Sequence, residues 1–339
     1  MFSHRKWVRA LAATVIPLVV TASLADIVLP RWLNLRDEPL CEDLVEKVNS
    51  LLIEPRRSPA ILIAGDSRAQ RQIIPAVLRR ELGVDAVNIA VAGGEFISTA
   101  KVLRRYGLTE TKPLLIVSVS SSLVNDGVVP VQIDCLMAMP WIDQLWISRS
   151  ELAELARRKA QVYSECLLAR IGWFPPKKKK AKDFSEDGFF GIETTLDASD
   201  PKAIPIRGGK ITHPWYKDLH QDGLRWRVFQ TALADIARTG CPILLLNCPC
   251  SPTWRQLSRD TFVDAAEKNY SRMLQQEATK YDNVRVLDFY DGWIEEFPDP
   301  LFYDIQHLNR AGAERFTTIL AAEIRRLNLL SPPPEPSRP

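Results

Sequence analysis

The chain has 339 residues, of which 46% are hydrophobic and 25% are charged, and its formal net charge is +3. These values are typical of a globular protein, and the length suffices for one large α/β domain or two smaller ones. The basic residues are scattered apart from a lysine run at residues 177–180, so we expect no nucleic-acid partner.

The first 33 residues are typical of a membrane anchor. Residues 10–29 contain one charged side chain, Asp26, and a helix of about 20 residues at about 1.5 Å per residue spans a bilayer core of about 30 Å. Basic residues precede this stretch, which by the positive-inside rule leaves the N-terminus in the cytoplasm. The rest of the chain would then face the periplasmic side of an inner membrane. A signal peptide cleaved after Ala25 is the alternative, although apolar residues continue beyond that point.

The cysteines predict neither a disulfide pattern nor a metal site. All six are compatible with an oxidising compartment, but their spacing indicates no pairing. Cys248 and Cys250 are separated by a single residue, and no histidine follows closely enough in sequence to complete a metal site.

Residues 34–57 are expected to form a linker with a short amphipathic helix, and the main domain is expected at residues 58–330. In this domain, short apolar segments of strand length alternate with helix candidates. Strands separated by helices indicate a parallel sheet covered on both faces, so we predict an α/β fold with about five parallel strands. The strand candidates are residues 60–64, 86–91, 113–120, 241–246 and 284–289, and the helix candidates include a stretch through residues 73–82 and residues 97–106, 228–238 and 263–280.

Residues 127–221 interrupt this alternation, and we interpret them as an insertion. The lysine run within it is expected to be a solvated loop, with contact to an anionic lipid or an acidic glycan as the alternative. His213 and His220 also lie in the insertion, where loop packing is favoured over substrate binding. Residues 331–339 contain five prolines and are expected to be disordered.

Ser67 is the candidate nucleophile. It follows the first strand candidate in the sequence Gly65-Asp66-Ser67 and precedes a helix. Such a junction puts a hydroxyl at the edge of the sheet where active sites of parallel sheets lie, and it points helix N–H groups towards a developing anion. By itself the tripeptide is equally a turn in which Asp66 or Ser67 caps the helix.

Asp304 and His307 are the candidate orienter and base. They lie three residues apart, ahead of an amphipathic helix for which Asn309 is a candidate N-cap. A carboxylate at this spacing can bind the Nδ1–H of the imidazole, which leaves Nε2 to accept the proton of a serine. Without Ser67, a surface histidine near a helix cap would be the better interpretation.

Together with residues 88–94 (Asn-Ile-Ala-Val-Ala-Gly-Gly), these segments resemble the sequence blocks of the SGNH (GDSL) hydrolase superfamily. The resemblance covers roughly residues 59–125 and 241–327. It implies a three-layer α/β/α flavodoxin-like sandwich and a serine hydrolase without a metal or organic cofactor. By the same resemblance, the catalytic residues are Ser67, Asp304 and His307, and the oxyanion hole is formed by the N–H groups of Ser67 and Gly93.

The sequence departs from the family in the third block. The family places Gly-x-Asn-Asp directly after the third strand, whereas here Ser118 leads through three further serines to Asn125. Asn125 is the candidate third oxyanion donor, with one of Ser120, Ser121 and Ser122 as the alternative. Loss of one donor costs on the order of a hundredfold in rate, so the departure predicts weakened activity.

These observations predict a membrane-anchored serine esterase or acyltransferase that acts on an ester or an acylated glycan. An anchor followed by an SGNH-like domain is similar to proteins that acetylate cell-envelope or exported polysaccharides, for which a multispanning acyltransferase is an expected partner. Two alternatives stay open. The domain could be a non-catalytic SGNH-like module that binds a glycan or acts as a scaffold, or it could be a lipid esterase or thioesterase.

Overall fold

A computed structural model describes residues 42–125, 184–197, 206–207, 210–211, 216, 220–290 and 293–330. The predicted anchor at residues 10–29, the lysine run, His213 and the tail at residues 331–339 lie outside these ranges. Within the described ranges, no helix combines the length and the apolar character needed to cross a membrane.

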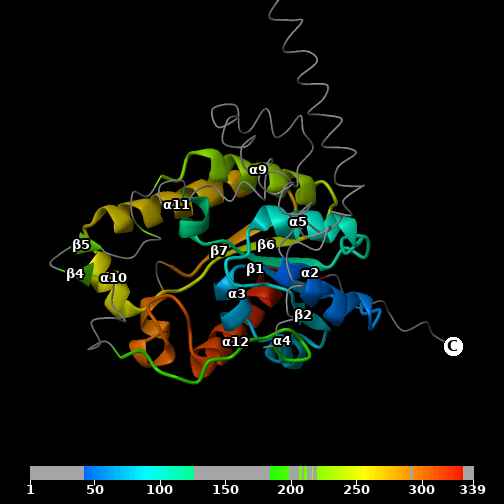
Figure 1. Cartoon of the computed structure of the whole chain (residues 1–339), viewed down its shortest axis with the longest axis horizontal. Helices are drawn as coiled ribbons and strands as arrows, with labels where there is room; N and C mark the ends of the chain where they lie inside the picture. The colour runs from blue at the N-terminus through cyan, green and yellow to red at the C-terminus, as the bar shows by residue number, and fades with distance from the viewer. Residues whose placement is uncertain are drawn as a thin grey trace, which may run out of the picture. The chain divides into compact units, whose positions relative to one another are not determined.

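The centre of the domain is a parallel sheet with the strand order β2-β1-β3-β6-β7 (Figure 1). Every residue of β1, β3 and β6 is buried, as expected for strands covered on both faces. The order is that of flavodoxin-like sheets, in which the strand order reverses between β1 and β3. The predicted α/β class is therefore confirmed. The strands are β1 (Ile61–Gly65), β2 (Ala86–Asn88), β3 (Leu114–Ser118), β6 (Ile243–Asn247) and β7 (Val284–Asp288), and a separate antiparallel pair is formed by β4 (Ile206–Arg207) and β5 (Lys210–Ile211).

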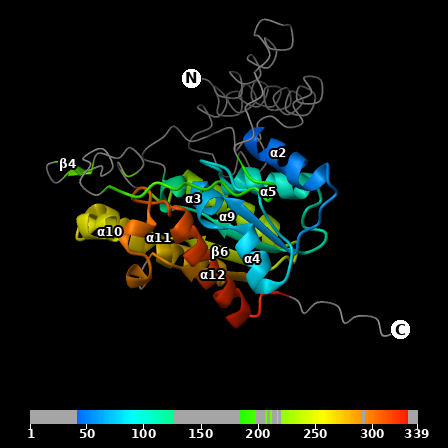
Figure 2. The same cartoon turned by 90° about the horizontal axis from the view of Figure 1, so that it is seen from below.

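Helices cover both faces of the sheet. In Figure 1, α5, α9 and α11 lie above it, and α3, α4 and α12 lie below it. Figure 2 shows the lower layer from beneath, with α4 and α12 in front of the sheet. The helices are α2 (Glu42–Val48), α3 (Ser67–Gln72), α4 (Pro75–Leu82), α5 (Phe96–Arg105), α9 (Leu224–Ala237), α10 (Pro252–Ser258), α11 (Phe262–Ala278) and α12 (Arg310–Arg326), with a π-helix η1 (Asn49–Ile53) and a 3-10 helix η2 (Ser121–Val124).

The helical stretch predicted after β1 is divided into two helices, α3 and α4. Ile73 and Ile74 have extended backbones, because Pro75 disfavours helical geometry in the residue before it. A threonine of α12 satisfies the backbone at this break: Thr317 Oγ1 accepts a hydrogen bond from the N–H of Ile74 at 3.0 Å. The apolar stripe of the sequence continues across the break, so hydrophobic spacing alone did not show it.

The segment predicted as a linker contributes to the core. Leu44, Val48 and Leu52, on α2 and η1, are each at most 2% exposed. The predicted short helix in this segment is confirmed, and it packs near α5. The described part of the segment is thus an element of the domain.

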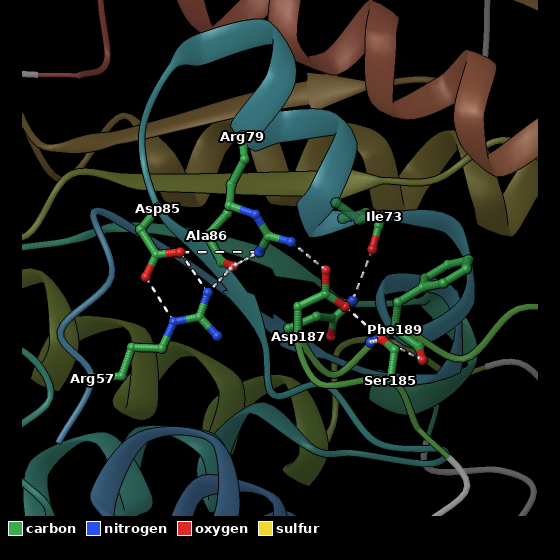
Figure 3. Close-up of polar contacts among 9 residues, drawn as sticks. Arg57, Ile73, Arg79, Asp85, Ala86, Ser185, Asp187 and Phe189 are labelled. Carbon is green, nitrogen blue, oxygen red and sulfur yellow. Dashed lines mark hydrogen bonds and ion pairs between the residues drawn. The ribbon is translucent and has the colours of Figure 1, made fainter. Parts of the chain in front are cut away.

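Residues 184–197, which we term the return segment, leave the predicted insertion and run along the domain. The N–H of Asn88 donates to the carbonyl of Asp187 at 2.9 Å, which continues the hydrogen bonding of the β2 edge. The Asp187 carboxylate forms an ion pair with Arg79 at 2.9 Å, and Figure 3 shows this contact beside the ion pair of Arg57 with Asp85. These contacts attach the return segment to β2 and α4.

Candidate active site

The candidate site begins at the C-terminal end of β1, next to the point where the strand order reverses. Gly65 has φ +117°, and a Cβ atom there would lie 2.1 Å from the carbonyl oxygen of Ser118 on β3. Only glycine allows this approach of two backbones. Asp66 then caps α3, because its Oδ1 accepts hydrogen bonds from the N–H of Arg68 and the hydroxyl of Ser118, both at 3.0 Å. Capping is therefore the role of Asp66, and Ser67 is the first residue of the helix.

The structure brings Ser67, His307 and Asp304 together. Ser67 Oγ lies 2.8 Å from His307 Nε2, across 240 positions of sequence. On the other side of the ring, His307 Nδ1 lies 2.9 Å from Asp304 Oδ2. Asp304 Oδ1 also accepts hydrogen bonds from the backbone N–H groups of Gln306 and His307, both at 2.8 Å. The side chains of His307 and Asp304 are 14% and 31% exposed, so the three groups form a continuous, partly buried chain.

The charge of Asp304 determines how this chain can act. Burial raises the pKa of Asp304, but hydrogen bonding and charge attraction to His307, with the backbone hydrogen bonds of Gln306 and His307, lower it further, to about 2. The group is therefore a carboxylate at neutral pH. It favours a proton on Nδ1 of His307, which leaves Nε2 to accept the hydroxyl proton of Ser67.

Helix α3 also holds the loop that carries the histidine. Gln72 Nε2 donates to the backbone carbonyl of Gln306 at 2.7 Å, and Arg68 Nη2 donates to Gln306 Oε1 at 3.4 Å. Gln306 Nε2 in turn donates to the hydroxyl of Tyr216. The sequence prediction missed these residues. Their signal is the polar side chains one and five positions after Ser67, which lie on its face of a helix.

Two backbone donors predicted for the oxyanion hole are unoccupied. Neither the N–H of Ser67 nor that of Gly93 donates a hydrogen bond to another group among the described residues. Gly93 has φ +67° and open space where a Cβ would lie, whereas a Cβ on Gly94 would lie 2.4 Å from the carbonyl oxygen of Gly65. The loop after β2 therefore packs directly on the end of β1. The oxyanion role of the two donors stays a prediction.

The altered third block folds into the buried helix η2. The hydroxyl of Ser121 donates to Glu267 Oε1 at 2.5 Å, and the hydroxyls of Ser120 and Ser122 lie 3.1 Å apart. Asn125 is fully buried, and its Oδ1 accepts a hydrogen bond from the backbone N–H of His220 at 2.8 Å. All three serines thus have partners within the protein, and Asn125 stays the predicted third donor.

The described part of the chain has no group of three or more histidine, cysteine, aspartate or glutamate side chains placed to hold a metal ion. Cys241 and Cys248 are buried, and burial raises the pKa of Cys248 to about 12. This thiol therefore stays protonated at neutral pH.

Two solved structures are similar to the chain. The lipase/acylhydrolase from Enterococcus faecalis is 13% identical, with a TM-score of 0.40, and the match covers 80% of this chain and 97% of that one. A structure from Streptococcus pneumoniae named for a platelet activating factor is 14% identical, with a TM-score of 0.37, covering 89% and 99%. No protein-family model and no curated protein matches the chain. At this level of similarity, an inference about activity depends on the geometry of the site.

Proposed function

We propose that the chain is a serine-dependent ester hydrolase or acyltransferase of the SGNH type. One observation carries this proposal: the 2.8 Å contact of Ser67 Oγ with His307 Nε2, on a ring whose Nδ1 lies 2.9 Å from Asp304. Capping and turn formation explain Asp66, but neither explains why a serine and a histidine from opposite ends of the domain share a hydrogen bond. Nucleophilic catalysis requires that arrangement.

The reaction follows from the proton positions. His307 Nε2 takes the hydroxyl proton as Ser67 Oγ bonds to the ester carbonyl carbon, and the carbonyl electron pair moves onto oxygen. The N–H groups of Ser67 and Gly93 donate to this oxyanion. Collapse of the intermediate breaks the ester C–O bond, and the imidazolium gives its proton to the leaving alcohol. Water or a sugar hydroxyl then attacks the acyl-serine with His307 as base, which releases the acyl group and restores Ser67.

The substrate and location are proposed from the sequence. We infer an ester on a cell-envelope or exported polysaccharide, because residues 10–29 have the length and apolar character of an inner-membrane anchor that leaves the domain on the extracytoplasmic side. A multispanning acyltransferase would then supply or receive the acyl group.

The test uses the purified full chain with p-nitrophenyl esters of acetate, butyrate and octanoate. Ser67→Ala should lower turnover by at least about a thousandfold, and a fluorophosphonate should label Ser67 in the unmodified chain. Ser58→Ala is the matched control, because Ser58 is an exposed serine whose hydroxyl contacts only Thr111.

Unchanged turnover in Ser67→Ala would overturn the nucleophile assignment. No turnover and no labelling in the unmodified chain, together with binding to acylated glycan, would favour the non-catalytic module. Preference for octanoate over acetate would favour a lipid esterase.

A further inference from the structure

Tyr303 lies against the imidazole of His307. The two rings are stacked, with centroids 5.5 Å apart and planes inclined by 24°. The backbone N–H of Tyr303 donates to the carbonyl of His307 at 3.0 Å, so both ends of the short loop are joined. This spacing lies within the range of favourable offset ring stacking. One face of the imidazole is thereby covered.

Arg71 holds Tyr303 from the other direction. This residue of α3, one helical turn after Ser67, donates a hydrogen bond to the hydroxyl of Tyr303. Its guanidinium carbon lies 5.5 Å from the centre of the Tyr303 ring and 5.4 Å from that of Phe190 in the return segment. The N–H of Phe190 donates to the carbonyl of Gln70 at 3.2 Å, so the return segment is itself attached to α3.

Arg71 is bound by rings and a hydroxyl, without an acidic partner. Within the described ranges it takes part in no ion pair, and its Nε is buried without a hydrogen-bond partner. A half-buried guanidinium in such surroundings contributes little to neutralising another charge. Its contacts instead connect the helix that carries Ser67 to the ring that covers His307.

We propose that Tyr303 is a positioning residue that holds the His307 imidazole in line with Ser67, and that Arg71 fixes Tyr303 in that place. This inference rests on the proposed function. Proton transfer needs Nε2 within hydrogen-bond distance of the hydroxyl, and a covered ring face restricts rotation of the imidazole away from it. The same face attracts the imidazolium that forms during acylation.

The phenol itself has no role in proton transfer. Burial, followed by the charge of Asp304, raises the pKa of Tyr303, so the hydroxyl stays neutral at any pH at which the enzyme would work. A neutral phenol that accepts a hydrogen bond from Arg71 keeps the ring in place, which distinguishes Tyr303 from an acid or base of the reaction.

The experiment measures kcat and KM of the full chain for p-nitrophenyl acetate, and the rate of fluorophosphonate labelling at Ser67. Tyr303→Leu should lower kcat and the labelling rate in parallel by about ten- to a hundredfold with KM within twofold, because the base is displaced and substrate contacts are kept. Tyr303→Phe keeps the stacked ring and should restore kcat to within about fivefold of the unmodified chain. A purely structural role would not produce this pattern.

Two further variants keep the inference testable. Tyr106→Leu is the matched control, since Tyr106 also lies beside an arginine, with the Arg105 guanidinium 5.8 Å from its ring, but at the end of α5. If Tyr303→Leu does not fold, Arg71→Gln, which keeps the ring and removes its tie, should lower kcat by about threefold to tenfold.

Equal kcat in Tyr303→Leu and the unmodified chain would overturn the inference, as would a rise in KM at constant kcat or equal losses in Tyr303→Leu and Tyr106→Leu. The proposed function fails separately, if Ser67→Ala keeps its turnover. An inactive Ser67→Ala beside a fully active Tyr303→Leu would therefore remove the positioning role alone.

Discussion

Lys47 is a buried cation behind the loop that carries Gly93. The residue is 1% exposed, its Nζ donates to the carbonyl of Ala90 at 2.7 Å, and the same atom lies 5.2 Å from the centre of the Phe184 ring. Burial lowers the pKa of Lys47 to about 7, against a partial increase from Asp187. Below this pH the folded protein contains a desolvated charge, which the unfolded chain exposes to water at no cost.

The pKa of Lys47 predicts a pH dependence of stability with a definite sign. Between about pH 7 and the unfolded value of 10.5, the unfolded chain binds a proton that the folded chain has released, so the free energy of unfolding rises with pH. The interval from 7 to 10.5 is 3.5 pH units, and about 1.4 kcal/mol per unit gives about 5 kcal/mol in all. Lys47→Met removes the titrating group, so the unmodified protein should gain about 3 kcal/mol relative to this variant from about pH 7.5 to about pH 9.5.

Urea unfolding followed by tryptophan fluorescence measures this difference. Comparison with Lys47→Met at each pH cancels the titration of tyrosines and cysteines, which both proteins share. Lys268→Met is the control, because the Lys268 side chain is 53% exposed and should give a pH-independent difference. Parallel curves for the unmodified protein and Lys47→Met would refute the reasoning, since Lys47 would then be charged and solvated in the folded state.

Two further substitutions test the site and its support. Asp304→Asn should lower ester turnover by about 10³- to 10⁴-fold, because an amide does not stabilise the required tautomer and the imidazolium of His307; a loss below tenfold in protein with unchanged circular dichroism would contradict this role. Gly65→Ala should lower the free energy of unfolding by about 3 kcal/mol or more, because the new Cβ would lie 2.1 Å from the Ser118 carbonyl. Gly83→Ala, with positive φ but no atom within 4 Å, should cost about 1 kcal/mol in urea unfolding, and equal losses would rule out the close approach as the cause.

Several local features could be predicted from the sequence because they depend on residues a few positions apart. Apolar runs bounded by turn residues predicted the five strands, and the structure places each within a few residues of its predicted segment. Asn309 caps α12 by accepting a hydrogen bond from the N–H of Gly312 at 3.0 Å, as its position before an apolar stripe indicated. Asp304 and His307 lie within one turn of chain, so their contact was accessible to reasoning from spacing alone.

The contacts that assemble the site depend on packing between distant segments. The sequence predicted the types of Ser67 and His307, but their 2.8 Å separation follows from the order of the strands and the docking of the loop before α12 onto α3. The return segment and α2 were assigned to an insertion and a linker, because short amphipathic pieces do not indicate which surface they will cover. Periodicity shows which face of an element is buried, and it does not identify the partner. The burial of Lys47 and the stacking of Tyr303 on His307 were therefore decided by tertiary structure.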